Sequence, residues 1–493
     1  MPDIDPDLLG LLSKVSAVLH QHNYPAYVVG GFVRDWLLGG RTADIDIAVD
    51  GDALNIAQKI ARAVGGKYIV LDEANRVARV IVVDEKVWHL DFSSFSNGIH
   101  NDLGRRDFTI DAMAVELKDL VSGSPQFIDP FSGKSDLEKK LLRVVSQGIF
   151  EEDAARLLRG VRLAAELGFK IEPGTESLIK KDCRLVKLVP GERLREETVR
   201  MLALPGSSEI VRYLDKLGLL TAVIPEMDEM KGVEQPNEHY WDVFDHSVET
   251  IAAAEFLLRD SRWKYGKKDL LTVIPWSEDI SRHFDEDVSV GSNRKVLLKL
   301  GALMHDIAKP ATKTVDETGR ARFLGHTKQG ASVAAGILER LRFSGREIRL
   351  VENLVYHHLR PAQIANEGLP TSRAIYRYFR DAEGAGIDIL FLALADYLAT
   401  HGPELDIEEW KQHNLLINYI LTEHMKQESE VLLAKLIDGH ELMDIFGLRP
   451  GRLVGELLTE VREAQVAGEL STREEAIELV RKELENRQCG MAC

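Results

Sequence analysis

The sequence has few cysteines and no long hydrophobic run, and each shortage excludes a class of protein. Only three of its 493 residues are cysteine, too few for a disulfide framework and typical of a reducing cytoplasm. The longest apolar stretches, such as residues 389–395, fall far short of the ~20 residues that span a bilayer. The first residues carry acids without a basic flank, so the sequence predicts no signal peptide. We therefore expect a cytoplasmic protein.

The remaining composition is that of a globular protein. Hydrophobic residues make up 45% of the chain and charged residues 29%, which excludes a disordered or collagen-like chain. At roughly 150 residues per domain, the length corresponds to about three domains. The fold must therefore be sought in several parts of the chain.

Positive charge is scarce overall but not evenly so. The chain has 62 Lys and Arg against 79 Asp and Glu, a net charge of −17. Residues 139–200 alone carry 14 basic and 10 acidic residues. Because nucleic-acid binding depends on local patches rather than on the total, the net charge does not exclude it. This segment is either a binding surface or an ordinary solvated helical face.

Hydrophobic periodicity predicts two kinds of architecture along the chain. The first ~130 residues alternate between helix-like and strand-like patterns, which indicates a small mixed sheet covered by helices. We expect helices at 1–23, 33–38 and 53–64, and strands at 27–29, 44–49, 68–71, 78–83 and 87–92. From about residue 136 the strand patterns fade and the chain reads as helical.

A glycine pair and two aspartates form the first group of candidate site residues. Gly30 and Gly31 end a strand before a helix, where backbone N–H groups can approach a phosphate closely. Arg34, one turn into that helix, could bind a phosphate oxygen. Asp44 and Asp46 are two apart on a strand, so their carboxylates share one face. Such a pair provides the oxygen ligands that Mg²⁺ requires when it binds a nucleoside triphosphate.

A two-metal site often uses a third carboxylate on a neighbouring strand. Asp91, within the predicted strand 87–92, is the candidate. Each of these features alone also fits a plain turn or an exposed strand face. Their combination, with an arginine between the glycines and the aspartates, favours a functional site.

Two further groups combine arginines with carboxylates. Arg105 and Arg106 are adjacent and are followed by polar residues, a pattern that can bind a triphosphate and ribose hydroxyls. Asp153, Arg156 and Arg159 recur every three residues, so we expect them on one helix face. A carboxylate beside a guanidinium offers an acceptor and donors to a base edge. An intrahelical salt-bridge ladder would produce the same spacing.

Histidines are concentrated in the central part of the chain. Neutral imidazoles and carboxylates on packed helices can converge on one or two divalent metals, which would activate water for phosphoester hydrolysis. Any single histidine of this kind is more often structural. The candidate metal ligands are His246, His305, Asp306, His326, His357, His358 and Asp396.

Five motifs in this order resemble those of the class II tRNA nucleotidyltransferase and bacterial poly(A) polymerase family. The resemblance covers residues ~25–235. The matching segments are Gly30-Gly31-x-x-Arg34-Asp35, Asp44-x-Asp46, Arg105-Arg106-Asp107-Phe108-Thr109, Asp129-Pro130-Phe131-x-Gly133-x-x-Asp136-Leu137 and Glu152-Asp153-x-x-Arg156-x-x-Arg159. The resemblance implies a polymerase-β-like head followed by helical neck and body segments.

The same resemblance implies roles for individual residues. It implies Mg²⁺ at Asp44 and Asp46, and nucleotide contacts from Gly31, Arg34, Arg106, Arg159 and Arg162. It also implies that Asp153 and Arg156 read the base edge of incoming CTP or ATP without a nucleic-acid template. We further assign Gly30, Asp35, Arg105 and Asp107 to nucleotide binding and Asp91 to catalysis.

Two departures from the family pattern affect the expected activity. Asp111 stands where the family usually has Asn. Only residues 93–104 separate the predicted strand from Arg105, whereas enzymes that add all of CCA typically carry a longer flexible loop there. The short segment resembles CC-adding enzymes and some A-adding relatives. Full CCA addition and poly(A) synthesis remain alternatives.

The histidine-rich region resembles the HD phosphohydrolase domain, including the core Leu303-x-His305-Asp306-Ile307-x-Lys309. His246, His305, Asp306 and Asp396 match its metal ligands, with His326, His357 and His358 as additional candidates. A protein in which this domain hydrolyses cyclic phosphates or nucleotides, and the head only recruits RNA, is a second hypothesis. A non-catalytic RNA scaffold is a third, against which the Asp44/Asp46 pair argues.

We therefore predict an α+β multidomain protein: a nucleotidyltransferase head with a small mixed sheet, followed by all-helical neck/body, HD and tail domains. The predicted boundaries are 1–138 for the head, 139–235 for the neck and body, 236–402 for the HD domain and 403–493 for the tail. The expected partners are tRNA, CTP and ATP, and the expected cofactors are Mg²⁺ at the transferase site and a divalent metal at the HD site.

Overall fold

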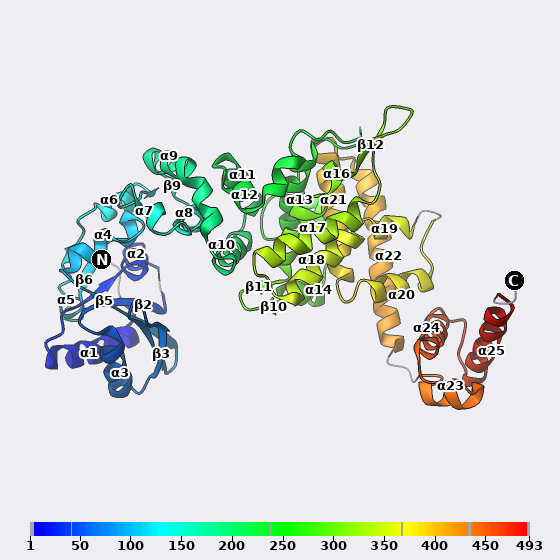
Figure 1. Ribbon diagram of the computed structural model, residues 1–493, viewed down its shortest axis with the longest axis horizontal. Coiled ribbons are helices and arrows are strands. Elements are labelled where there is room, and N and C mark those ends of the chain that lie inside the picture. The colour runs from blue at the N-terminus through cyan, green and yellow to red at the C-terminus, as the bar shows by residue number, and fades with distance from the viewer. Residues whose placement is uncertain (1–3, 41, 237, 366–367, 432–434, 491–493) are drawn as a thin grey trace. The chain divides into compact units, whose positions relative to one another are not determined.

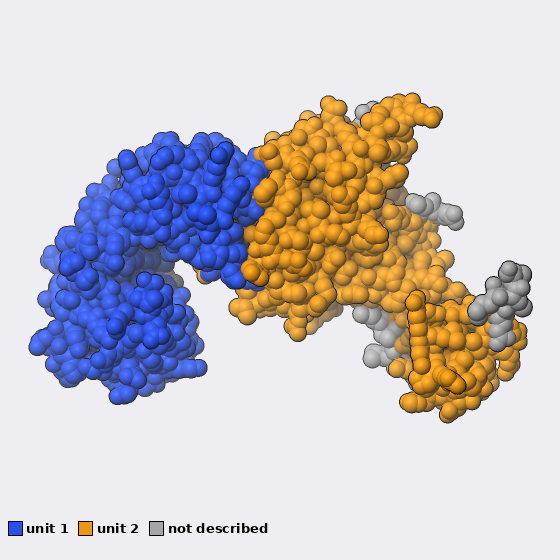
Figure 2. Space-filling view, in the orientation of Figure 1, with its two compact units in different colours: residues 1–197, 213–223 blue, residues 198–212, 224–493 orange. Residues whose placement is uncertain are grey.

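The computed structural model describes residues 4–40, 42–236, 238–365, 368–431 and 435–490. The chain forms two compact units (Figures 1 and 2). Unit 1 contains residues 1–197 and 213–223, and unit 2 contains residues 198–212 and 224–493. In the part of the chain that is described, no helix has the length and apolar character needed to cross a membrane.

Unit 1 is built on a mixed seven-stranded sheet with the order β3-β4-β5-β2-β1-β6-β7. The strands are β1 (Ala26–Val29), β2 (Asp44–Asp50), β3 (Lys67–Asp72), β4 (Val77–Val83), β5 (Val87–Phe95), β6 (Ala114–Glu116) and β7 (Phe127–Ile128). β2 and β5 are parallel, and the other neighbours in the sheet are antiparallel. The predicted small mixed sheet is confirmed.

Helices of unit 1 cover this sheet and continue beyond it (Figure 1). α3 packs on β3, β4 and β5 and contacts α1, burying its regularly spaced apolar residues. The helices of the sheet region are α1 (Pro6–Gln21), α2 (Gly31–Leu37), α3 (Ala53–Val64), α4 (Ile99–Gly104), η1 (Thr109–Asp111), α5 (Leu117–Val121) and α6 (Gly133–Glu138).

Between α6 and the end of α12 the chain is mainly helical, as predicted, and also contains one short parallel ladder. The elements are β8 (Leu141–Leu142), α7 (Ile149–Glu152), α8 (Arg156–Leu167), β9 (Lys170–Ile171), α9 (Pro173–Asp182), η2 (Cys183–Leu188), α10 (Gly191–Ala203), α11 (Ser207–Lys216) and α12 (Leu219–Val223). β8 pairs with β9, which ties the start of this segment to the end of α8.

Unit 2 is helical, with two short hairpins. Its central helices α13, α15, α17, α18 and α21 pack on one another, and α13 and α21 are buried along most of their length. The elements up to α19 are η3 (Pro225–Met230), α13 (Val243–Leu257), η4 (Lys268–Val273), α14 (Glu278–Asp285), β10 (Asp287–Ser289), β11 (Ser292–Asn293), α15 (Arg294–Met304), α16 (Lys309–Thr312), β12 (Lys313–Val315), β13 (Ala321–Phe323), α17 (His326–Arg340), α18 (Gly345–His357) and α19 (Arg360–Gln363).

The end of unit 2 has a small hydrophobic core of its own. Ile437, Leu442, Leu457, Val461 and Val480 are buried there together. The remaining elements are α20 (Ser372–Asp381), α21 (Gly386–His401), η5 (Gly402–Glu404), α22 (Ile407–Val431), α23 (Gly439–Phe446), α24 (Arg452–Val466) and α25 (Arg473–Gly490). The division into four domains at 138, 235 and 402 stays a prediction.

Candidate functional site

The two aspartates lie at the start of β2, the central strand of the sheet. Asp44 is exposed and Asp46 is half-buried, and the parallel register places them opposite His89 and Asp91 of β5. His89 Nδ1 lies 2.9 Å from Asp44 Oδ1. Burial raises the pKa of Asp46, and the charges of Asp91 and Asp44 add to this while Arg106 opposes it. A nearby cation would stabilise the ionised form of this carboxylate.

Asp91 has a strong partner that the sequence analysis missed. Arg79, its cross-strand neighbour on β4, donates from Nε to Oδ1 and from Nη2 to Oδ2, both at 2.7 Å. This bidentate pairing is geometrically specific. Both oxygens of the predicted third carboxylate therefore already accept a hydrogen bond. Within the described part of the chain, neither Asp44 nor Asp46 has a bidentate arginine partner of this kind.

Gly30 allows an arginine to approach Asp46. Its φ of +70° lies in the left-handed region, and a Cβ there would lie 2.6 Å from Arg106 Nη1 and 3.0 Å from Asp46 Oδ2. Only glycine combines this backbone angle with the free space. The Arg106 guanidinium and the Asp46 carboxylate therefore both lie at the turn between β1 and α2.

The predicted nucleotide-binding arginines are held by carboxylates. Arg105 and Arg106 pair with Asp102, at 3.0 and 3.4 Å, and Arg159 Nε lies 3.0 Å from Asp107 Oδ2. Separately, Arg34 on α2 donates from Nε to Asp35 Oδ1 at 2.8 Å and from Nη1 to Asp111 Oδ1 at 2.7 Å. The charges of Arg106, Arg159, Asp44 and Asp91 all affect the pKa of Asp46, so these side chains lie near Asp46.

The structure corrects the expectation that Asp153 shares a helix face with the arginines. α8 begins at Arg156, and Asp153 precedes it with an extended backbone, φ −151° and ψ 101°. Arg193 donates to both Asp153 carboxylate oxygens, at 2.8 and 2.7 Å. Arg156 donates to the carbonyl of Arg105 at 3.0 Å. Asp153 and Arg156 are thus positioned separately, the first by a residue outside the recognised motif.

Arg162, predicted as a nucleotide contact, is only 5% exposed. It donates to Glu197 at 2.6 Å and to Glu166 at 2.5 Å. Glu166 lies on α8 itself and is exposed, whereas the contact with Glu197 ties α8 to α10. The structure therefore places Arg162 in the packing of these helices.

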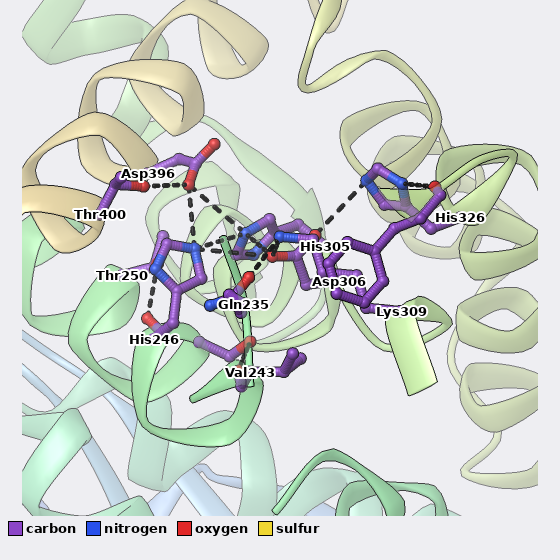
Figure 3. Close-up of polar contacts among 12 residues, drawn as sticks. Gln235, Val243, His246, Thr250, His305, Asp306, Lys309, His326, Asp396 and Thr400 are labelled. Carbon is purple, nitrogen blue, oxygen red and sulfur yellow. Dashed lines mark hydrogen bonds and ion pairs between the residues drawn. The ribbon is translucent and has the colours of Figure 1, made fainter. Parts of the chain in front are cut away.

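Six of the seven candidate metal ligands in unit 2 converge from different helices. Figure 3 labels all of them except His358. His246 lies on α13 and Asp396 on α21, while His305 and Asp306 follow α15; His326 begins α17 and His358 follows α18. Ligand atoms of His246, His305 and Asp396 lie within 4.8 Å of one another, and so do those of Asp306, His326 and His358.

Asp306 connects the two sets. Its Oδ2 lies 3.2 Å from His305 Nε2, and its Oδ1 lies 3.5 Å from His326 Nε2. A carboxylate that presents one oxygen to each set has the arrangement of a bridging ligand. Lys309 Nζ lies 2.6 Å from Asp306 Oδ2 and donates to Gln235 at 2.6 Å. Gln235 is a further contact that the sequence did not reveal.

Burial favours the neutral, metal-binding form of most of these histidines. It lowers the pKa of His246 and His326, and together with the charge of His305 it lowers the pKa of His358 to about 3. His305 is the exception: burial lowers its pKa, but the charges of Asp306 and Asp396 raise it by more, so the net shift is upward. The donor set of imidazoles and carboxylates fits a divalent metal.

His357 lies outside both sets. Its ring packs on Tyr356 with centroids 4.6 Å apart, and its pKa is lowered by burial and by Arg360. Of this adjacent pair, only His358 belongs to a ligand set. In contrast, His239, which the sequence analysis did not single out, packs with its ring 5.4 Å from that of His246.

Three family models match the chain. "Poly A polymerase head domain" matches residues 26–143, "Probable RNA and SrmB- binding site of polymerase A" matches 168–231, and "HD domain" matches 243–401. The HD match contains all six residues of the two ligand sets. The nucleotidyltransferase and HD families generally use divalent metals.

Curated relatives align over almost the whole chain. An A-adding tRNA nucleotidyltransferase of Deinococcus radiodurans is 32% identical over 93% of this chain and 95% of the relative. A CC-adding tRNA nucleotidyltransferase of Thermus thermophilus is 32% identical over 92% of each. A solved CCA-adding enzyme with ATP shares the fold, with a TM-score of 0.65, 23% identity and coverage of 98% of this chain and 96% of that one. The chain therefore belongs to the family of tRNA nucleotidyltransferases and bacterial poly(A) polymerases, and it carries an HD domain.

Proposed function

We propose that this enzyme adds C, A or both to the 3′ end of tRNA from CTP and ATP, without a nucleic-acid template. The observation that carries the proposal is the pair Asp44 and Asp46 on one strand, with Arg106 beside Asp46 at the Gly30 turn. Full-length relatives named for A addition and for CC addition support the same reaction class. A tRNA complex of the CCA-adding enzyme of Thermotoga maritima shares the fold, with a TM-score of 0.60.

Asp44 and Asp46 fit Mg²⁺, because they place two hard oxygen ligands side by side on one strand. Burial and the charges of Asp91 and Asp44 raise the pKa of Asp46, so a bound cation would stabilise its ionised form. Bound ions would stabilise the charge on the attacking 3′ oxygen and on the leaving pyrophosphate. The guanidinium of Arg106 is placed to bind and orient the triphosphate next to these carboxylates. In this account Asp91 supports the site through its pairing with Arg79.

Base selection is proposed for Asp153 and Arg156. A carboxylate accepts a hydrogen bond from the exocyclic amino group of cytosine or adenine, whereas uracil and guanine present a carbonyl at the equivalent position. Arg156 supplies donors for ring acceptors, and its contact with the Arg105 carbonyl fixes its place beside the nucleotide site. Side chains of the protein thereby take the part of a template.

We propose that the enzyme is of the CC-adding subtype. Residues 93–104 complete β5 and form α4, and Ile99 and Leu103 of α4 are buried in one cluster with Val29 and Ala48. A segment anchored in the core differs from the long flexible loop associated with full CCA addition.

Residues 139–235 carry the basic segment and are proposed to hold tRNA by its phosphates and shape. Such a substrate agrees with a cytoplasmic location.

Single-turnover assays on tRNA transcripts test this proposal. Transcripts that end at the discriminator base should receive two C residues when CTP is supplied with Mg²⁺, and transcripts that end in CC should receive no A from ATP. Addition of only A to the CC transcript would identify an A-adding enzyme. A long A tail on unrelated RNA would identify a poly(A) polymerase, and no addition to any transcript would contradict nucleotidyl transfer.

A second function is proposed for the HD domain, namely metal-dependent hydrolysis of a phosphoester such as a 2′,3′-cyclic phosphate. The specific observation is that Asp306 presents one oxygen to each of two ligand sets. Each set could hold one divalent ion, and bound ions would supply an activated water. Lys309, held beside Asp306, contributes a positive charge to the same site.

Metal analysis tests this second proposal independently of hydrolysis. The purified chain should retain up to two divalent ions, and His305→Ala and Asp306→Ala should lose them together with any hydrolysis of cyclic nucleotides. His357→Ala is a matched control because His357 lies outside the sets. Equal metal content in all four proteins would contradict the assignment.

A further inference from the structure

The six ligands of the HD domain are buried to different degrees. Asp396 is the most exposed of them, with 20% of its side chain accessible, whereas each of the other five is at most 10% exposed. A substrate reaches the proposed metal centre most readily where a ligand is accessible. We therefore expect a phosphoester to approach on the side of Asp396.

The segment that leads into α13 lies along this side. The backbone N–H of Tyr240 donates to the carbonyl of Thr400 at 2.9 Å, and the Thr400 hydroxyl donates to Asp396 Oδ1 at 3.4 Å (Figure 3). His239, the residue before Tyr240, packs with its ring 5.4 Å from that of His246. His239 therefore lies beside the accessible ligand and beside a buried one.

His239 carries a polar atom that the described part of the chain leaves without a partner. Its Nδ1 is buried and has no hydrogen-bond partner among the described residues, which is costly unless a ligand supplies one. Burial lowers the pKa of His239 to about 4, and Lys309, His246, Asp396 and Asp306 act on it as well. The ring therefore lies within electrostatic reach of both ligand sets.

Hydrogen bonds on either side of this histidine hold the segment in position. The backbone N–H of Val243 donates to the carbonyl of Val233 at 3.1 Å and closes the base of the segment. Gln235 donates from Nε2 to the carbonyl of Trp241 at 3.3 Å and accepts from Lys309 Nζ at 2.6 Å. Such preorganisation reduces the cost of binding a ligand.

A phosphoester requires a hydrogen-bond donor at this place. Its non-bridging oxygens only accept hydrogen bonds, and a bond from an N–H group to them is charge-assisted. Lys309 Nζ is already engaged by Asp306 and Gln235, each at 2.6 Å. A neutral imidazole has one N–H to donate, so His239 Nδ1 can supply the donor that the substrate needs.

We propose that the N–H at Nδ1 of His239 donates a hydrogen bond to a phosphate oxygen of the substrate and orients the phosphoester at the HD site. This inference rests on the proposed hydrolytic function of the HD domain and adds a substrate-binding residue to it. His239 belongs to neither ligand set, so the contact is made with the substrate and metal binding is left to the six ligands.

Binding of inorganic phosphate to the Mn²⁺-loaded full-length protein tests this contact without turnover. Calorimetric titration gives the affinity, and His305→Ala, which lacks a ligand of the HD site, gives the binding that arises elsewhere in the chain. We expect His239→Ala to weaken phosphate binding at the HD site at least about tenfold, with its metal content unchanged. Wild-type affinity in His239→Ala, loss of its metal, or no phosphate binding at the HD site of the wild type would overturn the inference.

Two conservative variants locate the donor on the ring. In His239→Asn the amide N–H₂ takes the place of Nδ1, and in His239→Gln it takes the place of Nε2. We expect the first variant to keep the phosphate affinity within about threefold of wild type and the second to lose it as His239→Ala does. Rescue by His239→Gln and not by His239→Asn would contradict the assignment to Nδ1. This pair also decides the question if His239→Ala does not fold.

His413 of α22 offers a competing assignment. Its Nε2 is also buried without a partner among the described residues, and its ring stacks on that of Tyr397, the residue after Asp396, with centroids 4.3 Å apart. His413→Ala should leave the phosphate affinity unchanged, as should His357→Ala, a control outside the ligand sets. If His413→Ala alone weakens phosphate binding, His413 contacts the substrate and the inference about His239 is wrong.

Hydrolysis of 2′,3′-cyclic AMP separates the inference from the function on which it rests. When the wild type hydrolyses this probe, His239→Ala should raise KM at least about tenfold and change kcat less, because the contact is made before the transition state as well as in it. An unchanged KM with a lower kcat would overturn the inference. No hydrolysis by the wild type would contradict the proposed hydrolytic function, and the phosphate titrations would still decide the role of His239.

Discussion

At the scale of single residues, the proposed site consists of charges held by other charges. Arg79 clamps Asp91, Arg193 clamps Asp153, and Asp102 pairs with Arg106. Each pairing fixes a rotamer before a ligand binds, and preorganisation of this kind reduces the cost of binding. Arg79 and Arg193 were not identified from the sequence, because nothing in their local pattern points to the distant carboxylate that each contacts. Asp102 lies only four residues before Arg106 and was not singled out either.

Arg193 provides a test of this preorganisation. Arg193→Lys keeps the charge but loses the bidentate geometry, so Asp153 should sample more than one orientation. We expect the preference for CTP over UTP to fall about tenfold, while the rate with CTP falls less. Misincorporation assays on transcripts measure this ratio.

The control for Arg193 is Lys180→Met, which breaks an exposed ion pair with Glu176 elsewhere in unit 1. It should not change base selection. An unchanged ratio of CTP to UTP in Arg193→Lys would show that Asp153 does not depend on Arg193.

The raised pKa of Asp111 predicts that the free energy of unfolding depends on pH. Its pKa in the folded protein is about 6, raised by burial from an ordinary value of 3.8, so the folded state binds the proton more tightly than the unfolded state. Stability from this group is therefore greatest below pH 4 and is lost as the pH rises through 6. The difference in free energy of unfolding between Asp111→Asn and wild type should grow by roughly 2 kcal/mol from pH 4 to pH 7. Paired denaturation curves at each pH measure it, and a constant difference would contradict it.

At the scale of elements, hydrophobic periodicity predicted the regular strands and helices well. It did not predict features that depend on contacts with distant parts of the chain. The predicted strands 44–49 and 78–83 and the helix 53–64 correspond to β2, β4 and α3 within a residue of each bound, because alternation and the apolar stripe are local. The expectation that Asp153 shares a helix face with Arg156 and Arg159 was wrong, since α8 begins at Arg156 and the extended backbone at Asp153 depends on contacts that spacing does not show. His357 lies outside both ligand sets for a related reason: its ring packs on Tyr356, a contact that the sequence pattern does not show.

The contact between α6 and η1 predicts an effect on the stability of unit 1. A Cβ at Gly133, the first residue of α6, would lie 2.1 Å from the Thr109 carbonyl oxygen, a backbone atom that cannot move aside cheaply. Gly133→Ala should therefore destabilise the protein by about 2 kcal/mol or more. Gly148→Ala is the matched control, because nothing lies within 4 Å of the added Cβ and its φ is −89°. Chemical denaturation of both variants decides between a packing effect and a general cost of the substitution.

At the scale of the whole molecule, the two proposed sites belong to different units. Asp44 and Asp46 lie in unit 1, and both histidine ligand sets lie in unit 2. The sequence motifs could place the sites in separate parts of the chain, because each motif is a short local pattern. The joining of two ligand sets by Asp306 could not be predicted, since it depends on how five helices pack.

This separation predicts independent activities. His305→Ala should keep nucleotide addition within about twofold of wild type while metal retention by unit 2 falls. The converse variant, Asp46→Asn, should keep the metal content of unit 2. Addition assays and metal analysis on the same preparations measure both properties, and loss of addition in folded His305→Ala would show that the sites are coupled.

The most direct test of the central claim is single-turnover addition of C to a tRNA transcript that ends at the discriminator base, with Mg²⁺, by wild type and by Asp46→Asn. We predict two additions by the wild type and a loss of at least about 100-fold in rate in the variant, because a metal ligand contributes no less than the outer contacts that support it. Circular dichroism would confirm that the variant is folded. Addition by Asp46→Asn at the wild-type rate would contradict the assignment of the β2 carboxylates as the catalytic centre.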